Sequence, residues 1–256
     1  MKIVVCIKQV PDTTDIKWTE NNTIQREGVE SVMNPYDVWA LEAALSIRKK
    51  RRNVFITALS MGPNQAVSML KKTVSLGADN AILISDKKFA GADTYATGKT
   101  IAKAIAEKLA GTDLVICGQF AVDGDTAQTG PSIASQLGLP QVTFVREIKE
   151  ISDDYIVVER EVENGREIVE VQLPALICML QSDAEPTRAK VAGIIKAQNF
   201  EVKQYGHEDL NLPPEEIGIK GSPTYVSRAF RPEKRQECVI VDSVEDLAKA
   251  IGGENG

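Results

Sequence analysis

Short apolar runs alternate with amphipathic segments along most of the first 180 residues. The apolar runs cover residues 3–7, 54–59, 81–84, 114–117 and 176–180. Between most of them, apolar side chains recur at helical spacing, as in residues 38–47, 66–74 and 101–109. Continuous apolar strands that alternate with amphipathic helices are typical of parallel strands joined by crossover helices. The pattern therefore predicts a doubly wound α/β fold.

The pattern changes after Pro140. Residues 142–145, 155–160 and 167–171 have strand composition, and Asn164-Gly165 lies between the last two as a hairpin turn. We expect an antiparallel hairpin, at about residues 142–172, appended to a mostly parallel sheet in a domain of residues 1–183. Residues 184–256 are polar and dotted with prolines until a short terminal helix. They predict an extended C-terminal arm that packs on another subunit.

Composition and charge exclude several classes of partner. The 256 residues are 43% hydrophobic and 26% charged, which is ordinary for a folded soluble chain. A net charge of −6 provides no general attraction to nucleic acids or anionic lipids. The initial apolar run is too short for a signal sequence, and no run approaches the roughly 20 residues of a membrane span. We expect a cytoplasmic protein with no nucleic-acid partner and no membrane partner.

The metal-ligating and nucleophilic residues are few and scattered. Cys6, Cys117, Cys178 and Cys238 lie far apart, and His207 is the only histidine. This set is too sparse for a zinc or iron–sulfur site, so we expect reduced thiols and no metal. His207 lies in a polar stretch and is interpreted as a solvated surface residue. No Ser-His-Asp or Cys-His set is visible, and we predict no catalytic residue.

The segment from Gly118 to Pro131 carries the main chemical signal. It follows the apolar run 114–117 and precedes helical spacing at residues 132–138. In α/β sheets, a loop that leads from a parallel strand into a helix N-terminus is a common nucleotide site. Thr126, Gln128 and Thr129 offer neutral donors to phosphate oxygens. Asp123 and Asp125 would repel phosphate, so we expect them to hold loop N–H groups or a ribose hydroxyl. A capped turn without a ligand is the alternative.

A second segment, residues 91–100, ends in Gly98-Lys99-Thr100 as a P-loop does. That motif requires glycine at the position of Asp93, because its backbone wraps the phosphates. We therefore reject a P-loop. We expect Asp93 or Thr94 to cap the helix that follows.

Several motifs in fixed order resemble one family over nearly the whole chain. They are MKIVVCIKQVP at residues 1–11, MNPYD at 33–37, ALSMGP at 58–63, GADT at 91–94, the loop 118–131, EREVENG at 159–165 and LPA at 173–175. With these motifs the sequence resembles the β subunit of electron transfer flavoproteins. The resemblance implies an αβ heterodimer that carries electrons between dehydrogenases, in which the β chain binds an adenine nucleotide and a redox-active FAD sits mainly in the α chain.

The resemblance also assigns nucleotide-binding positions. They come from the end of the first strand, the asparagine–proline turn, the residue before the Gly-Pro turn and the aspartate-rich loop. In this sequence the positions are Cys6, Asn34, Pro35, Tyr36, Asp37, Met61, Gly118, Gln119, Phe120, Ala121, Val122, Asp123, Gly124, Asp125, Thr126, Ala127, Gln128 and Thr129.

The loop sequence distinguishes two branches of the family. Members whose β chain holds AMP typically have an asparagine before the Gln-Thr pair and a third aspartate in the loop. This chain has Ala127 before Gln128-Thr129 and resembles the bifurcating branch, whose β subunit holds a second FAD and receives hydride from NADH. The small residues Gly124 and Ala127 leave room for the backbone to approach a pyrophosphate.

The bifurcating branch implies further partners. One electron passes to a low-potential acceptor such as ferredoxin, and the other passes through the α subunit to an acyl-CoA dehydrogenase-like or lactate dehydrogenase-like flavoenzyme. Residues 185–197 match the loop that recognises this enzyme, with Val191, Ile194 and Ile195 as apolar docking residues. Two alternatives stay open: a one-FAD electron carrier whose β chain holds structural AMP, and a nucleotide-binding regulatory domain without a redox role.

Overall fold

The computed structural model describes residues 1–12, 31–182, 184–227 and 240–252. They divide into a compact unit, Met1–Tyr225, and a smaller unit, Val226–Gly256. Within the second unit the structure describes one helix, α6 (Val244–Gly252), which begins with Ser243 Oγ accepting from the N–H of Asp246 at 3.0 Å. The fold of the first unit positions the candidate site.

The described residues form one large sheet, which is parallel over most of its width. Its nine strands lie in the order β11-β5-β4-β1-β6-β10-β7-β8-β9. Strands from β11 to β7 run parallel, and β8 and β9 are antiparallel to their neighbours. In chain order the strands are β1 (Lys2–Cys6), β4 (Phe55–Met61), β5 (Asn80–Ile84), β6 (Leu114–Gly118), β7 (Gln141–Ile151), β8 (Tyr155–Val162), β9 (Gly165–Gln172), β10 (Ala175–Met179) and β11 (Lys203–Tyr205). A separate antiparallel ribbon pairs β2 (Gln9–Pro11) with β3 (Ser31–Met33). The predicted fold class is confirmed.

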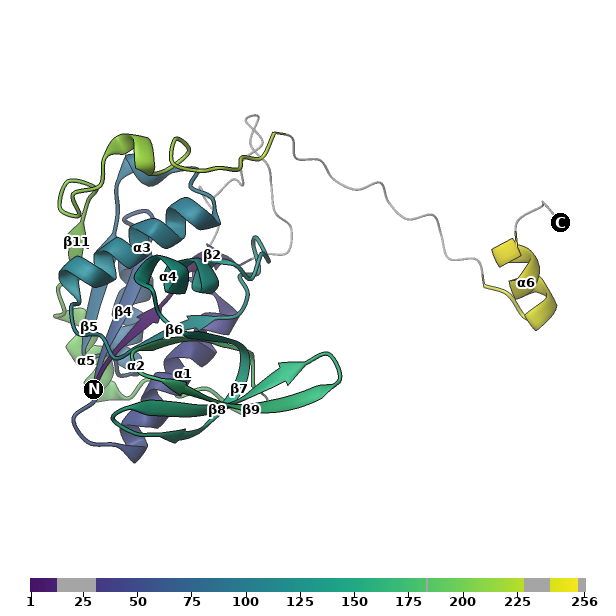
Figure 1. Ribbon diagram of the computed structural model, residues 1–256, viewed down its shortest axis with the longest axis horizontal. Helices are drawn as coiled ribbons and strands as arrows, with labels where there is room; N and C mark the ends of the chain where they lie inside the picture. The colour runs from purple at the N-terminus through teal and green to yellow at the C-terminus, as the bar shows by residue number, and fades with distance from the viewer. Residues whose placement is uncertain (13–30, 183, 228–239, 253–256) are drawn as a thin grey trace. The chain divides into compact units, whose positions relative to one another are not determined.

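Helices cover both faces of the sheet (Figure 1). One face carries the first two helices and the other carries α3 and α4, as in a doubly wound fold. The helices of this unit are α1 (Pro35–Lys50), α2 (Ala66–Leu76), α3 (Thr94–Lys108), α4 (Thr129–Leu137) and α5 (Val191–Gln198), with 3₁₀ turns at Lys87–Phe89 and Pro214–Glu216. Asp93 caps α3 by accepting from the N–H of Ala96 at 3.0 Å, as its sequence position predicts.

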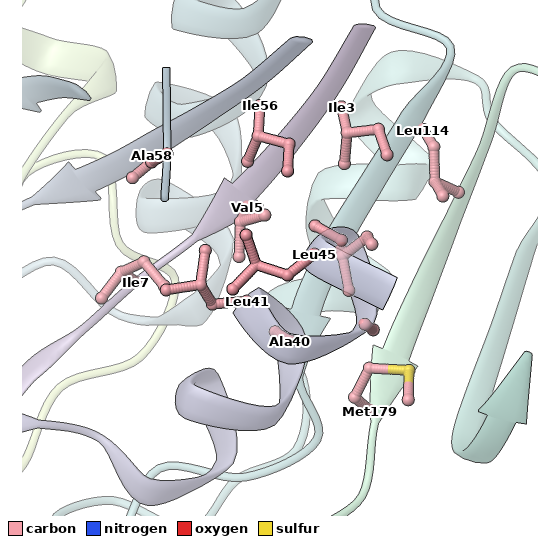
Figure 2. Close-up of a cluster of buried hydrophobic side chains, with 14 of the residues drawn as sticks. Ile3, Val5, Ile7, Ala40, Leu41, Leu45, Ile56, Ala58, Leu114 and Met179 are labelled. Atoms are coloured by element: carbon pink, nitrogen blue, oxygen red, sulfur yellow. The ribbon is translucent and has the colours of Figure 1, made fainter. Parts of the chain in front are cut away.

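Alternating side chains of β1 build the two halves of the core. Ile3 and Val5 of β1, and Ile7 directly after it, face α1, where Figure 2 shows them beside Leu41 and Leu45. Val4 points the other way, into a cluster that includes residues of α3 and α4. Because β1 is buried on both faces, it has an unbroken apolar sequence. That pattern is the signal that predicts a central parallel strand.

The antiparallel extension consists of β7, β8 and β9 and includes the predicted turn at Asn164-Gly165. Its outer positions carry cross-strand ion pairs, among them Arg146 with Glu161 and Lys149 with Glu159. Such exposed pairs add little stability each, so the apolar positions Ile148, Ile156 and Val158 fix which face is buried.

The sequence predicts an extended arm over residues 184–256. In the structure, the described residues between 184 and 225 instead belong to the first unit and pack against the sheet. β11 extends the sheet by pairing with β5, and Leu210, Leu212 and Ile217 are buried in the core on the α3 face. These apolar residues stand singly among polar ones, so no periodic pattern reveals them.

The interpretation of His207 as a solvated residue is wrong. His207 is 7% exposed, and its Nδ1 lies 2.6 Å from Oδ2 of Asp86. Its Nε2 lies 2.8 Å from Nζ of Lys88. The imidazole joins the segment after β11 to the turn after β5. Asp86 and Lys88 are more than a hundred residues away along the chain, so the local sequence does not indicate them.

Candidate functional site

The candidate site lies where the direction of winding reverses. From β1 the chain winds through β4 to β5 on one side, and α3 then returns it to β6 on the other side of β1. The crevice at the carboxyl ends of β1 and β6 is the usual ligand site of such sheets. Cys6 ends β1, Gly118 ends β6, and Met61 ends the neighbouring β4. The fold therefore brings these separate sequence motifs to one edge of the sheet.

Asn34 and its turn lie at the same edge, but its side chain is committed to the protein. Asn34 is 1% exposed, and its Nδ2 donates to the carbonyl of Phe120 at 2.8 Å. Its Oδ1 accepts from the N–H of Val122 at 3.3 Å. The amide therefore ties the loop after β6 to the beginning of α1. Asn34 shapes the loop rather than presenting its amide to a ligand.

Asp37, in the first turn of α1, is a buried carboxylate. Its Oδ2 accepts from the N–H of Lys8 at 2.6 Å. Burial raises the pKa of Asp37 from 3.8 to about 7, although hydrogen bonds from Lys8, Asn34 and Gly118 act in the opposite direction. Gly118 must be glycine here, because a Cβ would overlap Oδ1 of Asp37 and lie 2.8 Å from the main-chain carbon of Tyr36. The close approach of β6 and α1 thus depends on the absence of a side chain.

The aspartate-rich loop is held by an ion pair between residues that lie 115 positions apart, so no sequence motif indicates it. Nζ of Lys8 lies 2.5 Å from Oδ1 of Asp123, whose side chain is 4% exposed. The carbonyl of Ala121 accepts from the N–H groups of Gly124 and Asp125 at 3.0 and 2.7 Å. The pairing neutralises Asp123, so its charge does not prevent an anion from binding close by. The sequence predicts that Asp123 holds loop N–H groups or a ribose hydroxyl, and the structure adds Lys8 as its partner.

The loop after Gly124 adopts an unusual backbone. Asp125 and Ala127 have φ values of 50° and 56°, in the left-handed region that non-glycine residues rarely adopt. The side chain of Gln128, which precedes α4, makes no cap hydrogen bond to the helix, and its Oε1 accepts from Oγ1 of Thr94 at 3.3 Å. The N–H groups of the first turn of α4 are thus not capped by Gln128, which leaves that end of the helix suited to an anion.

Three thiols lie beneath this helix N-terminus. Cys117 and Cys178 are register partners on β6 and β10, and Cys117 is hydrogen-bonded to Cys6. The hydrogen bond to Cys6 and burial raise the pKa of Cys117, and burial raises the pKa of Cys178 to about 12. These two thiols are unreactive at neutral pH. Gly130 of α4 packs directly on them, since a Cβ there would overlap Sγ of Cys178.

An aromatic row borders the site on the β7 side. The rings of Tyr36 and Phe120 are 5.3 Å apart, and those of Phe120 and Phe144 are 5.9 Å apart, both edge to face. Phe144 lies in β7 and outside every sequence motif, so no local signal marks it as a site residue. On the opposite side, a small hollow is lined by Lys8, Gln9, Val10, Pro11, Ser31, Met61, Gly62, Pro63 and Gln65.

The predicted docking residues lie elsewhere, on α5. This helix packs on α2, with Nζ of Lys71 donating to the carbonyl of Gln198 at 3.2 Å. Val191, Ile194 and Ile195 form one outward face and are 74%, 45% and 55% exposed. They are not part of the site at the carboxyl ends of β1 and β6.

The described residues show neither a metal-ligand cluster nor a membrane-spanning helix. In that part of the chain, no three or more His, Cys, Asp or Glu side chains are grouped as metal ligands. None of its helices combines the length and apolar character needed to cross a membrane.

The fold defines a protein of the doubly wound α/β class, with the candidate site at the carboxyl ends of its central strands. The model of the electron transfer flavoprotein domain matches residues 21–210. The chain is 47% identical to the electron transfer flavoprotein subunit beta of Thermoanaerobacterium thermosaccharolyticum over 262 residues, covering 100% of this chain and 99% of that one. The chain belongs to the electron transfer flavoprotein family, among its β subunits, and acts in electron transfer.

The chain also matches, over nearly its whole length, two relatives that are named for reductases of coenzyme A thioesters. The chain is 45% identical over 254 residues to subunit CarD of the caffeyl-CoA reductase-Etf complex of Acetobacterium woodii, covering 98% of this chain and 96% of CarD. It is 38% identical over 263 residues to the acryloyl-CoA reductase electron transfer subunit gamma of Anaerotignum propionicum, covering 98% of both chains.

Proposed function

We propose that this chain pairs with an electron transfer flavoprotein α subunit and binds FAD at the carboxyl ends of β1 and β6. The heterodimer exchanges hydride with NAD(H) and divides electron pairs between ferredoxin and an acyl-CoA or lactate dehydrogenase-type flavoenzyme. The observation that carries the proposal is the first turn of α4, not capped by Gln128, beside a loop with the small residues Gly124 and Ala127.

The residues at the site fit a dinucleotide. The N–H groups of Thr129 and Gly130 open α4 and suit a pyrophosphate, while the pairing of Asp123 with Lys8 removes one source of repulsion. Cys6 and Met61 offer apolar contacts at the ends of β1 and β4. FAD supplies the hydride and single-electron chemistry when bound, so the chain itself needs only to bind, orient and shield it.

The printed names of the relatives support a reductase-type partner. CarD belongs to a caffeyl-CoA reductase complex, and the Anaerotignum propionicum subunit to an acryloyl-CoA reductase. Both names describe reduction of a coenzyme A thioester. This chain therefore delivers electrons to an enzyme of the acyl-CoA dehydrogenase type.

Two surfaces are proposed for the protein partners. The apolar face of α5, formed by Val191, Ile194 and Ile195, docks the flavoenzyme. The C-terminal part of residues 184–256 packs on the α subunit through α6, where Val244, Leu247 and Ile251 lie at helical spacing and are exposed.

The deciding experiment is the cofactor stoichiometry of the heterodimer made by co-expression with the α subunit. Bound ligands are extracted and separated, and FAD and AMP are counted per dimer. Two FAD and no AMP support the proposal. One FAD with one AMP contradicts it and favours the simple electron carrier, and absence of any nucleotide from this chain would contradict both.

A pair of variants locates the second FAD. Ala127→Glu places a negative charge before the first turn of α4 and should remove one FAD per dimer. Gln136→Glu introduces the same charge at an exposed position in the last turn of that helix and should retain both. Equal FAD content in the two variants would place the second FAD elsewhere.

A further inference from the structure

Gln119 connects three strands at the edge of the candidate site. Gln119 is 3% exposed, and its Oε1 accepts from the N–H of Phe144 at 2.6 Å, across 25 residues of sequence. Its own N–H donates to the carbonyl of Met179 at 2.8 Å. One buried residue after β6 therefore ties the C-terminal end of β10 to the backbone of β7.

The backbone that Gln119 holds is strained. Phe144 has a φ of 59°, in the left-handed region that bulky residues almost never adopt, although it lies within a strand. The pairing of β7 with β10 shifts register beside it, between Ile177 and Met179. A strained residue persists only where its surroundings determine its conformation, and the hydrogen bond from Phe144 to Gln119 does so here.

The strained backbone carries the ring of Phe144 to the aromatic row. The ring meets Phe120 edge to face at 5.9 Å, and Phe120 meets Tyr36 in the same way at 5.3 Å. Phe144 remains 36% exposed, so part of its ring is accessible to a ligand. Three separate elements, α1, the loop after β6 and β7, thus contribute one aromatic surface.

We propose that Gln119 and Phe144 are positioning residues for the cofactor site: Gln119 holds Phe144, and Phe144 sets the rings of Phe120 and Tyr36 for contact with a planar cofactor ring. The inference rests on the proposed function, since the flavin is the planar group in question. The row offers edge-to-face contacts to such a ring. A regular strand at Phe144 would give up its bond to Gln119 and withdraw its ring from this surface.

The test uses the co-expressed heterodimer. Gln119→Met keeps the side-chain length but removes the acceptor, and Phe144→Leu keeps an apolar side chain but removes the ring. Phe144→Tyr keeps the ring and is the conservative rescue. Phe55→Leu is the matched control, because Phe55 is a half-exposed phenylalanine at the opposite end of β4. The readouts are the visible circular dichroism of the bound flavin, its midpoint potential and the dissociation constant for FAD.

Gln119→Met and Phe144→Leu should each change the flavin dichroism and weaken FAD binding by about three- to tenfold. Phe144→Tyr and Phe55→Leu should match the wild type. Unchanged flavin signals in Phe144→Leu would overturn the inference, even if Gln119→Met fails to fold. A wild-type complex with one FAD and one AMP would instead overturn the proposed function, together with the ring contact inferred from it.

Discussion

The side-chain amide of Asn34 donates to the main-chain carbonyl of Phe120 at 2.8 Å. The two residues lie 86 positions apart, one before α1 and the other after β6. The Oδ1 atom of the same amide accepts from the N–H of Val122, so one side chain satisfies a main-chain carbonyl and a main-chain N–H of the loop. It makes the shape of the loop depend on the first turn of α1.

Asn34→Ala should therefore weaken nucleotide binding although Asn34 presents no free amide to a ligand. Loss of the amide leaves the partly buried carbonyl of Phe120 and N–H of Val122 without this partner, which costs about 1 kcal/mol of stability. The FAD content of the heterodimer and its thermal midpoint measure the two effects. Asn199→Ala, at an exposed asparagine after α5, is the control and should change neither. A stable Asn34→Ala complex with normal FAD content would contradict this role.

Gly130 and Cys178 provide a second prediction, through packing. Gly130→Ala pushes α4 away from the strands, because the new Cβ overlaps Sγ of Cys178. The variant should lose about 1–3 kcal/mol of stability and most of its FAD. Cys178→Ala removes the overlapping atom, so the double variant should recover part of both losses. Strictly additive effects in this double-mutant cycle would show that the two residues do not determine the position of α4.

The sequence predicts the sheet well because buried parallel strands have continuous apolar sequences. Residues 3–7, 54–59, 81–84, 114–117 and 176–180 contain or overlap β1, β4, β5, β6 and β10. The predicted turn at Asn164-Gly165 is likewise a local signal, and it joins β8 to β9. The helix cap at Asp93 is confirmed for the same reason, since the chemistry of a cap lies within four residues.

The contacts that shape the site could not be predicted in this way. Lys8 and Asp123 form an ion pair although they are 115 residues apart. Gln119, after β6, accepts a hydrogen bond from Phe144 of β7, 25 residues further along the chain. The polar neighbours of His207 in the sequence predict an exposed side chain, but the fold buries it beside Asp86. The strand order determines which residues gather at the site. Only the structure shows that side chains such as those of Asn34 and Asp123 are already bonded within the protein.

The buried carboxyl of Asp37 predicts a pH dependence of stability. Its pKa is raised from 3.8 to about 7 in the folded chain, so folding favours the protonated form. This contribution is complete below about pH 4 and is lost as the pH rises through about 7, up to about 4 kcal/mol in all. Asp37→Asn lacks the titration, so its stability relative to wild type should increase from pH 4 to pH 8.

Unfolding of the heterodimer in urea at a series of pH values measures this difference. Asp154→Asn, at an exposed aspartate between β7 and β8, is the control and should follow the wild type at every pH. A difference between Asp37→Asn and wild type that does not vary with pH would show that Asp37 stays ionised in the folded chain.

His207 should stabilise the edge of the sheet. His207→Ala removes the imidazole between Asp86 and Lys88 and leaves both charged groups without it. We expect a loss of about 1–3 kcal/mol, concentrated at β11. Hydrogen exchange of the β11 amides should accelerate, while exchange at β1 and β6 changes little. Glu201→Gln, at an exposed position two residues before β11, is the control. Uniform acceleration in all strands would contradict a local role.

The apolar face of α5 provides the last prediction. Val191→Asp and Ile195→Asp place charges on this face without touching the residues that pack on α2. Each variant should keep the FAD content and NADH-dependent flavin reduction of the heterodimer, because the candidate site lies at another edge of the fold. Each should reduce electron delivery to the acyl-CoA dehydrogenase-type partner about tenfold or more, since exposed apolar anchors dominate small interfaces. Ile168→Asp, at an exposed isoleucine on β9, is the matched control. Normal delivery by both α5 variants would place the docking surface elsewhere, and a parallel loss of FAD would show that α5 supports the fold of the site instead.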